Sequence, residues 1–129
     1  MAVLLSGVAP VISREDDIAL RRLHYTELLD AAHIREEKDD GEPVVSNGIA
    51  MCKIHHAAYD RDIMGISPDY RIELRRDVLE ESDGPTLRYT LQGLHGEAIW
   101  TPRSRRHKPD PDLLAERFDR FRAHGSFPG

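Results

Sequence analysis

The sequence predicts an α+β fold in which a short hairpin leads into a helix, followed by further short strands and a C-terminal amphipathic helix. Three patterns predict it. Leu28 to Ile34 has the composition of a strand, and a charged, turn-rich loop separates it from a second extended piece, Pro43 to Ser46. Gly48 to Tyr59 spaces its apolar and polar residues as a helix does, and Asp110 to His124 carries one apolar stripe at helical spacing.

Other elements are predicted around this core. Ser13 to Leu29 opens like a helix and leads into the first strand, and Asn47 is placed to cap the helix that follows the hairpin. The remaining predictions are strands at Ile63 to Ile66 and Tyr70 to Leu74, a turn at Ser67 to Asp69 between them, a helical turn at Arg76 to Glu81, and a final strand at Ala98 to Thr101.

The length of 129 residues suits one domain with a modest core and is short for two. We expect that domain over residues 13–124, with its core in residues 28–66, after an apolar and loose segment, 1–12, and before a flexible tail, 125–129. The net charge of -5 argues against a protein that coats nucleic acid through bulk positive charge. Any contact with DNA therefore requires a local basic patch.

The cysteine content and the apolar start of the chain bear on its location. Cys52 is the single cysteine, so an intramolecular disulfide is impossible and a reducing cytoplasm fits. The apolar run in the first twelve residues has no basic region before it and is far shorter than the roughly 20 residues that span a bilayer. We expect a cytoplasmic protein without membrane association.

His56 and Asp60 form the local pattern with the clearest chemical content. Residues four apart on a helix project from one face, one turn from each other. An imidazole nitrogen and a carboxylate oxygen together suit Mg²⁺, Mn²⁺, Ni²⁺ or Zn²⁺, with water or substrate oxygens as further ligands. Taken alone, such a pair is more often a solvated surface contact, so both interpretations stay open on this pair.

The order His33, Asn47, His56 and Asp60, with a hairpin before a helix, resembles the HNH endonuclease family. The ββα-metal (His-Me finger) core of that family carries a histidine at the end of its first strand, an asparagine near the helix start and a histidine in the helix. The segments LLDAAHI, NGIAMC and HHAAYDRDIMGI are similar to the branch found in bacterial proteins classed as restriction endonucleases. The resemblance is dense from Leu28 to Ile66 and weaker downstream.

This resemblance implies a metal-dependent endonuclease that hydrolyses DNA phosphodiester bonds, with a role for each matching residue. His33 would be the general base that activates water, since a histidine accepts protons near neutral pH. Asn47 would hydrogen-bond the backbone across the loop that follows the His33 strand. His56 and Asp60 would hold the divalent cation, Mg²⁺ or Mn²⁺ with Ni²⁺ and Zn²⁺ as further candidates, which stabilises the phosphorane.

Two departures from the family pattern concern metal ligands near the strand and the helix. Many HNH proteins have an acidic residue or a histidine directly before the base, where this chain has Ala32. Asp30 lies on the opposite face of an ideal strand from His33, so we expect no metal contact from it.

Cys52 and His55 match half of a structural zinc site, but the upstream cysteines that would complete it are missing. We therefore expect Cys52 to be a buried small apolar residue and His55 to be a neighbour of the site.

DNA is the expected partner, bound either by a homodimer or by a part of a larger restriction-type protein. Arg61 directly follows Asp60 and is the candidate for touching the scissile phosphate. A basic cluster further along could neutralise backbone phosphates, or it could be an ordinary solvated loop. This cluster consists of Arg103, Arg105, Arg106, His107 and Lys108.

Three functional classes remain open from the sequence. The first is an active endonuclease, which the complete set of four site residues favours. The second is a catalytically weak HNH-fold domain that binds DNA, which the missing cysteines and the acidic net charge favour. The third is a metal-binding protein without nuclease activity that would use Cys52, His55 and His56.

Overall fold

The computed structural model describes residues 29–35, 41, 45–82, 84–101, 103 and 105–125. The apolar segment 1–12, most of the helix expected before the first strand, and residues 126–129 of the expected tail lie outside the described residues. So do residues 43 and 44 of the second extended piece.

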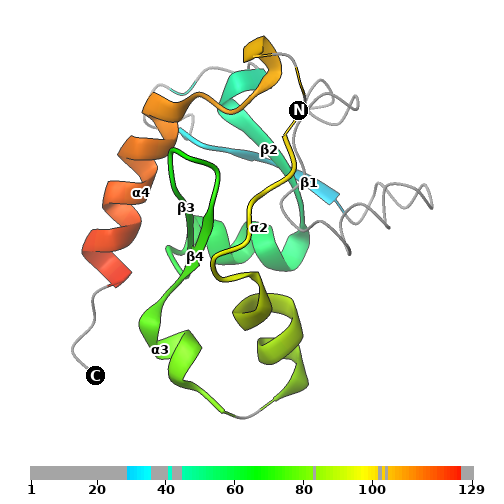
Figure 1. Ribbon diagram of the computed structural model, residues 1–129, viewed down its shortest axis with the longest axis vertical. Coiled ribbons are helices and arrows are strands. Elements are labelled where there is room, and N and C mark those ends of the chain that lie inside the picture. The colour runs from blue at the N-terminus through cyan, green and yellow to red at the C-terminus, as the bar shows by residue number, and fades with distance from the viewer. Residues whose placement is uncertain are drawn as a thin grey trace.

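The fold is α+β, as the sequence predicts, with small antiparallel sheets and helices packed on them (Figure 1). Single helical turns lie between the main elements, at Val45–Asn47, Leu87–Leu91, Gln92–Leu94 and Arg105–His107. In chain order and with the labels of Figure 1, the strands and longer helices are β1 (Leu29–His33), β2 (Gly48–Cys52), α2 (Lys53–Asp60), β3 (Met64–Ile66), β4 (Ile72–Leu74), α3 (Arg76–Glu80) and α4 (Pro111–Gly125).

The predicted hairpin and the helix after it are confirmed, but their boundaries are shifted. β1 pairs antiparallel with β2, with His33 opposite Gly48 and Leu29 opposite Cys52. The second strand is therefore Gly48–Cys52, and the predicted strand at Pro43 to Ser46 is wrong at its described residues, which begin a 3-10 turn. The predicted helix start is also wrong, because α2 begins at Lys53.

The physical reason for this shift lies in the composition of β2. The strand is buried at four of its five positions, so its apolar residues do not alternate with polar ones, and short apolar runs of this kind fit a strand and a helix equally well. Pairing with β1 decides the outcome. Asn47 is consequently six residues before the first residue of the helix, and Cys52 stands at its N-cap with extended backbone angles and no side-chain capping bond.

A second antiparallel pair, β3 and β4, follows α2, as predicted, with Met64 opposite Leu74. The predicted strand at Ala98 to Thr101 is wrong, because this segment does not pair as a continuous strand. Ala98 forms an isolated β-bridge to Arg71. Tyr70 has a left-handed φ of 66°, which bends the chain where further pairing would continue. The helical turns over residues 85–94, which the sequence did not predict, lead into this bridging segment.

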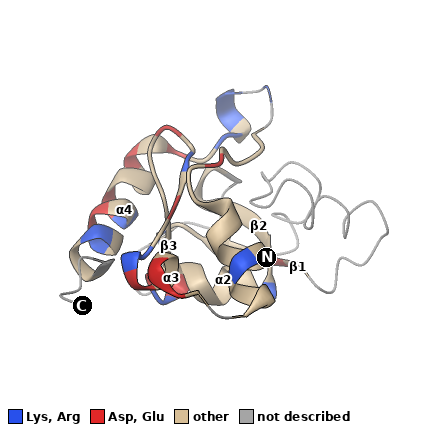
Figure 2. Cartoon of the chain, turned by 60° about the horizontal axis from the view of Figure 1, so that its bottom comes forward, with Lys and Arg blue, Asp and Glu red and all other residues tan. Residues whose placement is uncertain are grey.

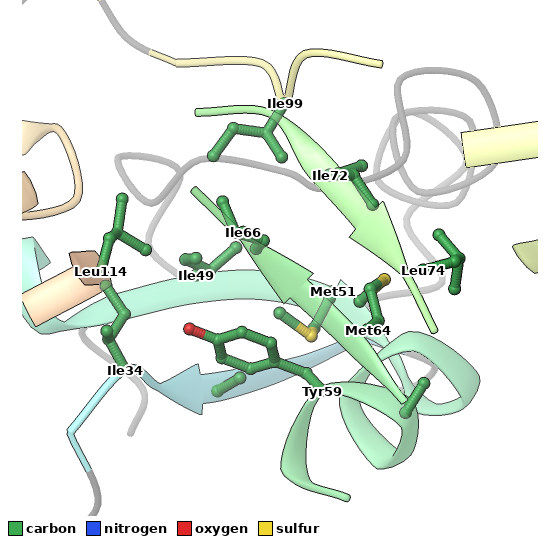
Figure 3. Packing of buried hydrophobic residues seen from close by; sticks show 12 residues of the cluster. Ile34, Ile49, Met51, Tyr59, Met64, Ile66, Ile72, Leu74, Ile99 and Leu114 are labelled. Carbon is green, nitrogen blue, oxygen red and sulfur yellow. The ribbon is translucent and has the colours of Figure 1, made fainter. Parts of the chain in front are cut away.

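One apolar core is shared by the β1–β2 hairpin, α2, β3, β4 and α4. Tyr59 of α2 is fully buried at its centre (Figure 3), and the Arg117 guanidinium of α4 lies over the Tyr59 ring, 4.1 Å from the ring centroid. α2 thus packs between the hairpin and the second sheet. The core consists of Ala32, Ile34, Ile49, Met51, Ala58, Tyr59, Met64, Ile66, Ile72, Leu74, Ile99 and Leu114.

A close contact between β3 and α4 sets the position of α4 against the second sheet. Gly65 of β3 is buried, and a Cβ atom at this position would lie 2.5 Å from Cδ2 of the buried Phe121 ring. No real side-chain contact is that short, so the helix approaches the sheet this closely only because residue 65 is glycine.

Gly65→Ala is expected to lower the free energy of unfolding by about 1 to 3 kcal/mol, because the methyl group overpacks the Phe121 ring. Urea unfolding of the wild type, Gly65→Ala, Phe121→Leu and the double variant measures this as a double-mutant cycle. The smaller leucine should recover part of the loss. Strictly additive effects of the two substitutions would contradict the close packing.

Candidate functional site

A row of three side chains lies along the seam between β1 and α2. His56 Nε2 is 3.1 Å from Asp60 Oδ2, one turn later on α2. On its other side, His56 Nδ1 is 2.9 Å from Oδ2 of Asp30 on β1. We call Asp30, His56 and Asp60 the acidic row, because an imidazole is held between two carboxylates.

Asp30 reaches the site through His56, a contact that the sequence did not predict. Asp30 and His33 lie on opposite faces of the strand, as alternation predicts, and α2 packs on the face that carries Asp30, Ala32 and Ile34, since Ala32 and Ile34 share the core with Tyr59. Asp30 lies at the edge of that face and reaches His56.

The charges of the acidic row support one another. The hydrogen bond to Asp60 raises the pKa of His56 to about 9, against the effect of partial burial and with further help from Asp30. Partial burial raises the pKa of the Asp60 carboxyl, but hydrogen bonds from His56 and Arg117 outweigh it and lower the pKa overall. Burial acts likewise on Asp30, where hydrogen bonds from Lys53 and His56 lower the pKa. Without metal, the ring is therefore an imidazolium at neutral pH.

The His56 and Asp60 pair has the spacing that a divalent cation needs. Two ligands at right angles and about 2.1 Å from an ion lie about 3 Å apart, close to the observed 3.1 Å between Nε2 and Oδ2. Within the described part of the chain, no group of three or more His, Cys, Asp or Glu residues could hold a metal. A cation would thus have two protein ligands and draw the others from water or phosphate oxygens, after His56 loses its proton.

Asn47 joins the start of β2 to the chain just beyond β1. Its buried side chain accepts a hydrogen bond from the Arg35 N–H at 2.7 Å and donates one to the Arg35 carbonyl at 3.0 Å. The Asn47 carbonyl also accepts from the Ile34 N–H at 2.9 Å. These bonds fix the backbone directly after His33. The second expected role of Asn47, as the cap of α2, is wrong because β2 lies between them.

His33 ends β1, and its imidazole makes no hydrogen bond or ion pair with any described residue, while its Nε2 atom is buried. Its backbone is tied to the acidic row, because Arg117 donates both to the His33 carbonyl and to Asp60. The convergence of the His33 ring with His56 and Asp60 on one cation stays a prediction.

Arg117 is the site residue that sequence reasoning missed. Its side chain is 4% exposed and hydrogen-bonds carbonyls of β1 and α2 as well as the Asp60 carboxylate. Arg117 lies within Asp110 to His124, three residues after Leu114 and four before Phe121, at the spacing of the predicted apolar stripe. That position was itself a signal, because arginine on a buried face must find partners for its charge.

Cys52 and His55, which match half of a structural zinc site in related proteins, lie at the N-terminal end of α2. Cys52 is partly exposed at the start of α2, so the expectation that it is buried is wrong, because it ends the strand rather than lying inside a helix. His55 is buried, and its Nε2 lies 2.9 Å from the Thr90 carbonyl. His55 therefore ties α2 to the helical turn Leu87–Leu91.

The residues predicted to contact DNA are exposed or partly exposed. Arg61 is exposed at the C-cap of α2, next to Asp60. The turn Arg105–His107 lies against the turn Val45–Asn47, and the Asp110 N–H donates to the Ser46 carbonyl at 2.8 Å. Figure 2 shows this basic turn at an edge of the molecule. Arg103, Arg105, Arg106 and Lys108 are therefore placed near the end of the hairpin where β1 stops at His33.

Comparison with known proteins supports the family resemblance. Residues 10–67 match the family model described as HNH endonuclease, and this region contains β1, β2, α2 and β3. The hairpin and α2 correspond to the ββα core of the HNH fold. The match supports a nuclease-type function in general, and HNH nucleases typically use a divalent metal. Neither the search of curated proteins nor the search of solved structures finds a match.

Of the helices that the structure describes, none has the length and apolar character needed to cross a membrane.

The pKa of His56 predicts how the stability of the metal-free protein depends on pH. A folded-state pKa of about 9, above the unfolded value of 6.5, gives a stabilisation that is complete below pH 6.5 and is lost as pH rises through about 9. Between these pH values, in EDTA, the melting temperature of the wild type should fall by about 5 °C more than that of His56→Gln. Thermal melts followed by circular dichroism measure this, and parallel curves would contradict the ion pairs of the acidic row.

Proposed function

We propose that the chain is a metal-dependent endonuclease that hydrolyses DNA phosphodiester bonds. The observation that carries the proposal is the acidic row: an imidazole and a carboxylate at cation-binding distance on α2, inside the region that matches the HNH endonuclease model. The histidine that ends β1 supports it further, because its buried Nε2 lacks a partner among the described residues.

His56 and Asp60 would hold a divalent cation, with Mg²⁺ and Mn²⁺ the first candidates and Ni²⁺ and Zn²⁺ further ones. When bound, the ion stabilises the charge that accumulates on the phosphate oxygens during attack. Asp30 bonds the far nitrogen of His56, which is the arrangement in which a carboxylate fixes the orientation and tautomer of a metal-ligating histidine.

His33 would accept the proton of the attacking water, as a general base does. Asn47 holds the backbone beyond His33 and so limits the movement of the base. Arg61 would contact the scissile phosphate beside Asp60, and the basic turn would neutralise phosphates further along the strand. The expected products are a 5′-phosphate and a 3′-hydroxyl, as is usual in the family. A restriction-type role in bacteria, as a homodimer or within a larger protein, belongs to the same proposal.

The two other functional classes are distinguished by the same assay. A metal-binding protein that uses Cys52, His55 and His56 gains no support, because His55 Nε2 contacts the Thr90 carbonyl and no three-ligand group lies among the described residues. A catalytically weak HNH-fold domain that binds DNA would leave plasmid DNA intact under all metal conditions.

Supercoiled plasmid should be nicked by the wild type with Mg²⁺ or Mn²⁺ and not in EDTA. His33→Ala should lower the rate about 10²- to 10⁴-fold while leaving metal affinity unchanged, because the base and not the cation site is removed.

Asp60→Asn should lose metal affinity and activity while its circular dichroism spectrum stays unchanged. Gel electrophoresis and titration calorimetry with Mn²⁺ measure the two effects.

Glu80→Gln is the matched control for Asp60→Asn, since Glu80 is also a helix carboxylate paired with a basic side chain, but it is exposed and distant from the acidic row. It should behave as the wild type. Equal nicking by the wild type and His33→Ala would rule out the proposed chemistry, and unfolding of Asp60→Asn would assign that residue a structural role.

Asp30→Asn should weaken Mn²⁺ binding by about 10- to 100-fold, because the amide no longer fixes the orientation and tautomer of His56 for metal binding. Titration calorimetry at constant pH measures the affinity. Asp77→Asn is the control, because Asp77 is an exposed carboxylate that is paired with Arg75 on α3. Wild-type affinity in Asp30→Asn would mean that the contact with His56 has no influence on the cation.

A further inference from the structure

α4 lies beyond the region that matches the HNH endonuclease model, which ends at residue 67, yet it supplies a buried arginine to the candidate site. Arg117 is 4% exposed. Its four described acceptors lie 57 to 84 residues earlier in the sequence. Two of them lie at the end of β1 and two at the end of α2. The site is therefore assembled from parts that are distant in the chain.

The two terminal nitrogens of Arg117 divide these acceptors between them. Nη1 donates to the carbonyls of His33 at 3.1 Å and Ile34 at 3.0 Å, where β1 ends. Nη2 donates to the Tyr59 carbonyl at 2.9 Å and to Asp60 Oδ1 at 3.1 Å, at the end of α2. A guanidinium is planar and rigid, so acceptors on one nitrogen are fixed relative to those on the other.

The bond to Asp60 also fixes the orientation of the carboxylate relative to His56. Arg117 binds Oδ1, and the other oxygen, Oδ2, lies 3.1 Å from His56 Nε2. Asp60 is 41% exposed, but the guanidinium is 4% exposed, so a turn of the carboxylate out of this plane would deprive a buried charge of one of its acceptors, which is costly. One carboxylate oxygen is thereby held in position to bind a cation together with His56.

We propose that Arg117 is a positioning residue of the nuclease site: it fixes the strand end that carries His33 against α2 and orients Asp60 so that Oδ2 serves as the metal ligand. This inference rests on the proposed function for its effect on catalysis. Its effect on metal binding rests on the proposed cation site of His56 and Asp60 and is measured without DNA.

Arg117→Lys is the informative variant. A lysine keeps the positive charge near Asp60, but its one compact ammonium group cannot serve the carbonyls of His33 and Ile34 at the end of β1, the carbonyl of Tyr59 on α2 and a carboxylate in a planar fork. Arg120→Lys is the matched control, because Arg120 lies one turn later on the same helix and pairs through Nε with the buried Asp62, outside the acidic row.

The test compares the wild type, Arg117→Lys and Arg120→Lys, each well below its melting temperature. Mn²⁺ affinity is followed by the electron paramagnetic resonance signal of the free ion, and plasmid nicking gives kcat and KM. We expect Arg117→Lys to bind Mn²⁺ about 10-fold more weakly and to lose about 10-fold or more in kcat, with KM for DNA changed by less than about threefold. Arg120→Lys should match the wild type in all three quantities.

A second variant guards against a purely structural explanation. If Arg117→Ala folds, guanidinium chloride at millimolar concentration should restore Mn²⁺ affinity in it, whereas urea at the same concentration should not. Restoration by both compounds, or by neither in the folded variant, contradicts the proposed role. If Arg117→Ala does not fold, Arg117→Lys decides alone.

The outcomes separate the inference from the proposed function. Folded Arg117→Lys with wild-type Mn²⁺ affinity and kcat overturns the inference and leaves the nuclease proposal standing. A wild type that binds Mn²⁺ but never nicks DNA refutes the nuclease proposal, and weaker Mn²⁺ binding in Arg117→Lys would still support the positioning role. A wild type that neither binds Mn²⁺ nor nicks DNA overturns both.

Discussion

The candidate site depends on one buried arginine side chain, Arg117, which hydrogen-bonds or packs against three elements. β1 and α2 meet along a short seam, and at its end the Arg117 guanidinium of α4 hydrogen-bonds carbonyls from both and lies over the Tyr59 ring. Burial of a guanidinium is unfavourable unless its donors are satisfied, so these bonds make the positions of strand, helix and α4 mutually dependent. The close approach of α4 to β3 at Gly65 then brings the arginine within reach.

In the absence of metal, a proton takes the place of the cation in the acidic row. His56 lies between two carboxylates that stabilise its charged form, and each carboxylate has a second basic partner, Lys53 for Asp30 and Arg117 for Asp60. In the proposed site, a divalent cation bound by His56 would replace this proton with an ion of twice its charge, with the carboxylates already in place. The exchange would need little rearrangement and would keep the acidic side chains compensated in both states.

Local spacing predicted the parts of the site that lie on one element, and nonlocal packing decided the rest. The i,i+4 distance of His56 and Asp60 holds for a helix that starts at Gly48 or at Lys53, so the wrong helix start did no harm to that prediction. The contact of Asp30 with His56 was not predicted, because strand alternation states which residues share a face but not which face α2 covers. Arg117 could not be placed because three of its four described acceptors are backbone carbonyls, which carry no sequence signal, and all four lie more than 50 residues away.

The net charge of -5 and the acidic row raise the question of how an anionic substrate would approach. In the metal-free protein the two carboxylates of the seam are compensated by His56, Lys53 and Arg117. In the proposed function a divalent cation would add positive charge facing the phosphodiester, so metal and DNA binding would favour each other. The basic turn is placed near the end of the hairpin that His33 occupies, because Arg105–His107 packs against the turn leading into β2. A duplex held there by its backbone would present a phosphate near the strand end, and the contacts that hold it would carry no base specificity.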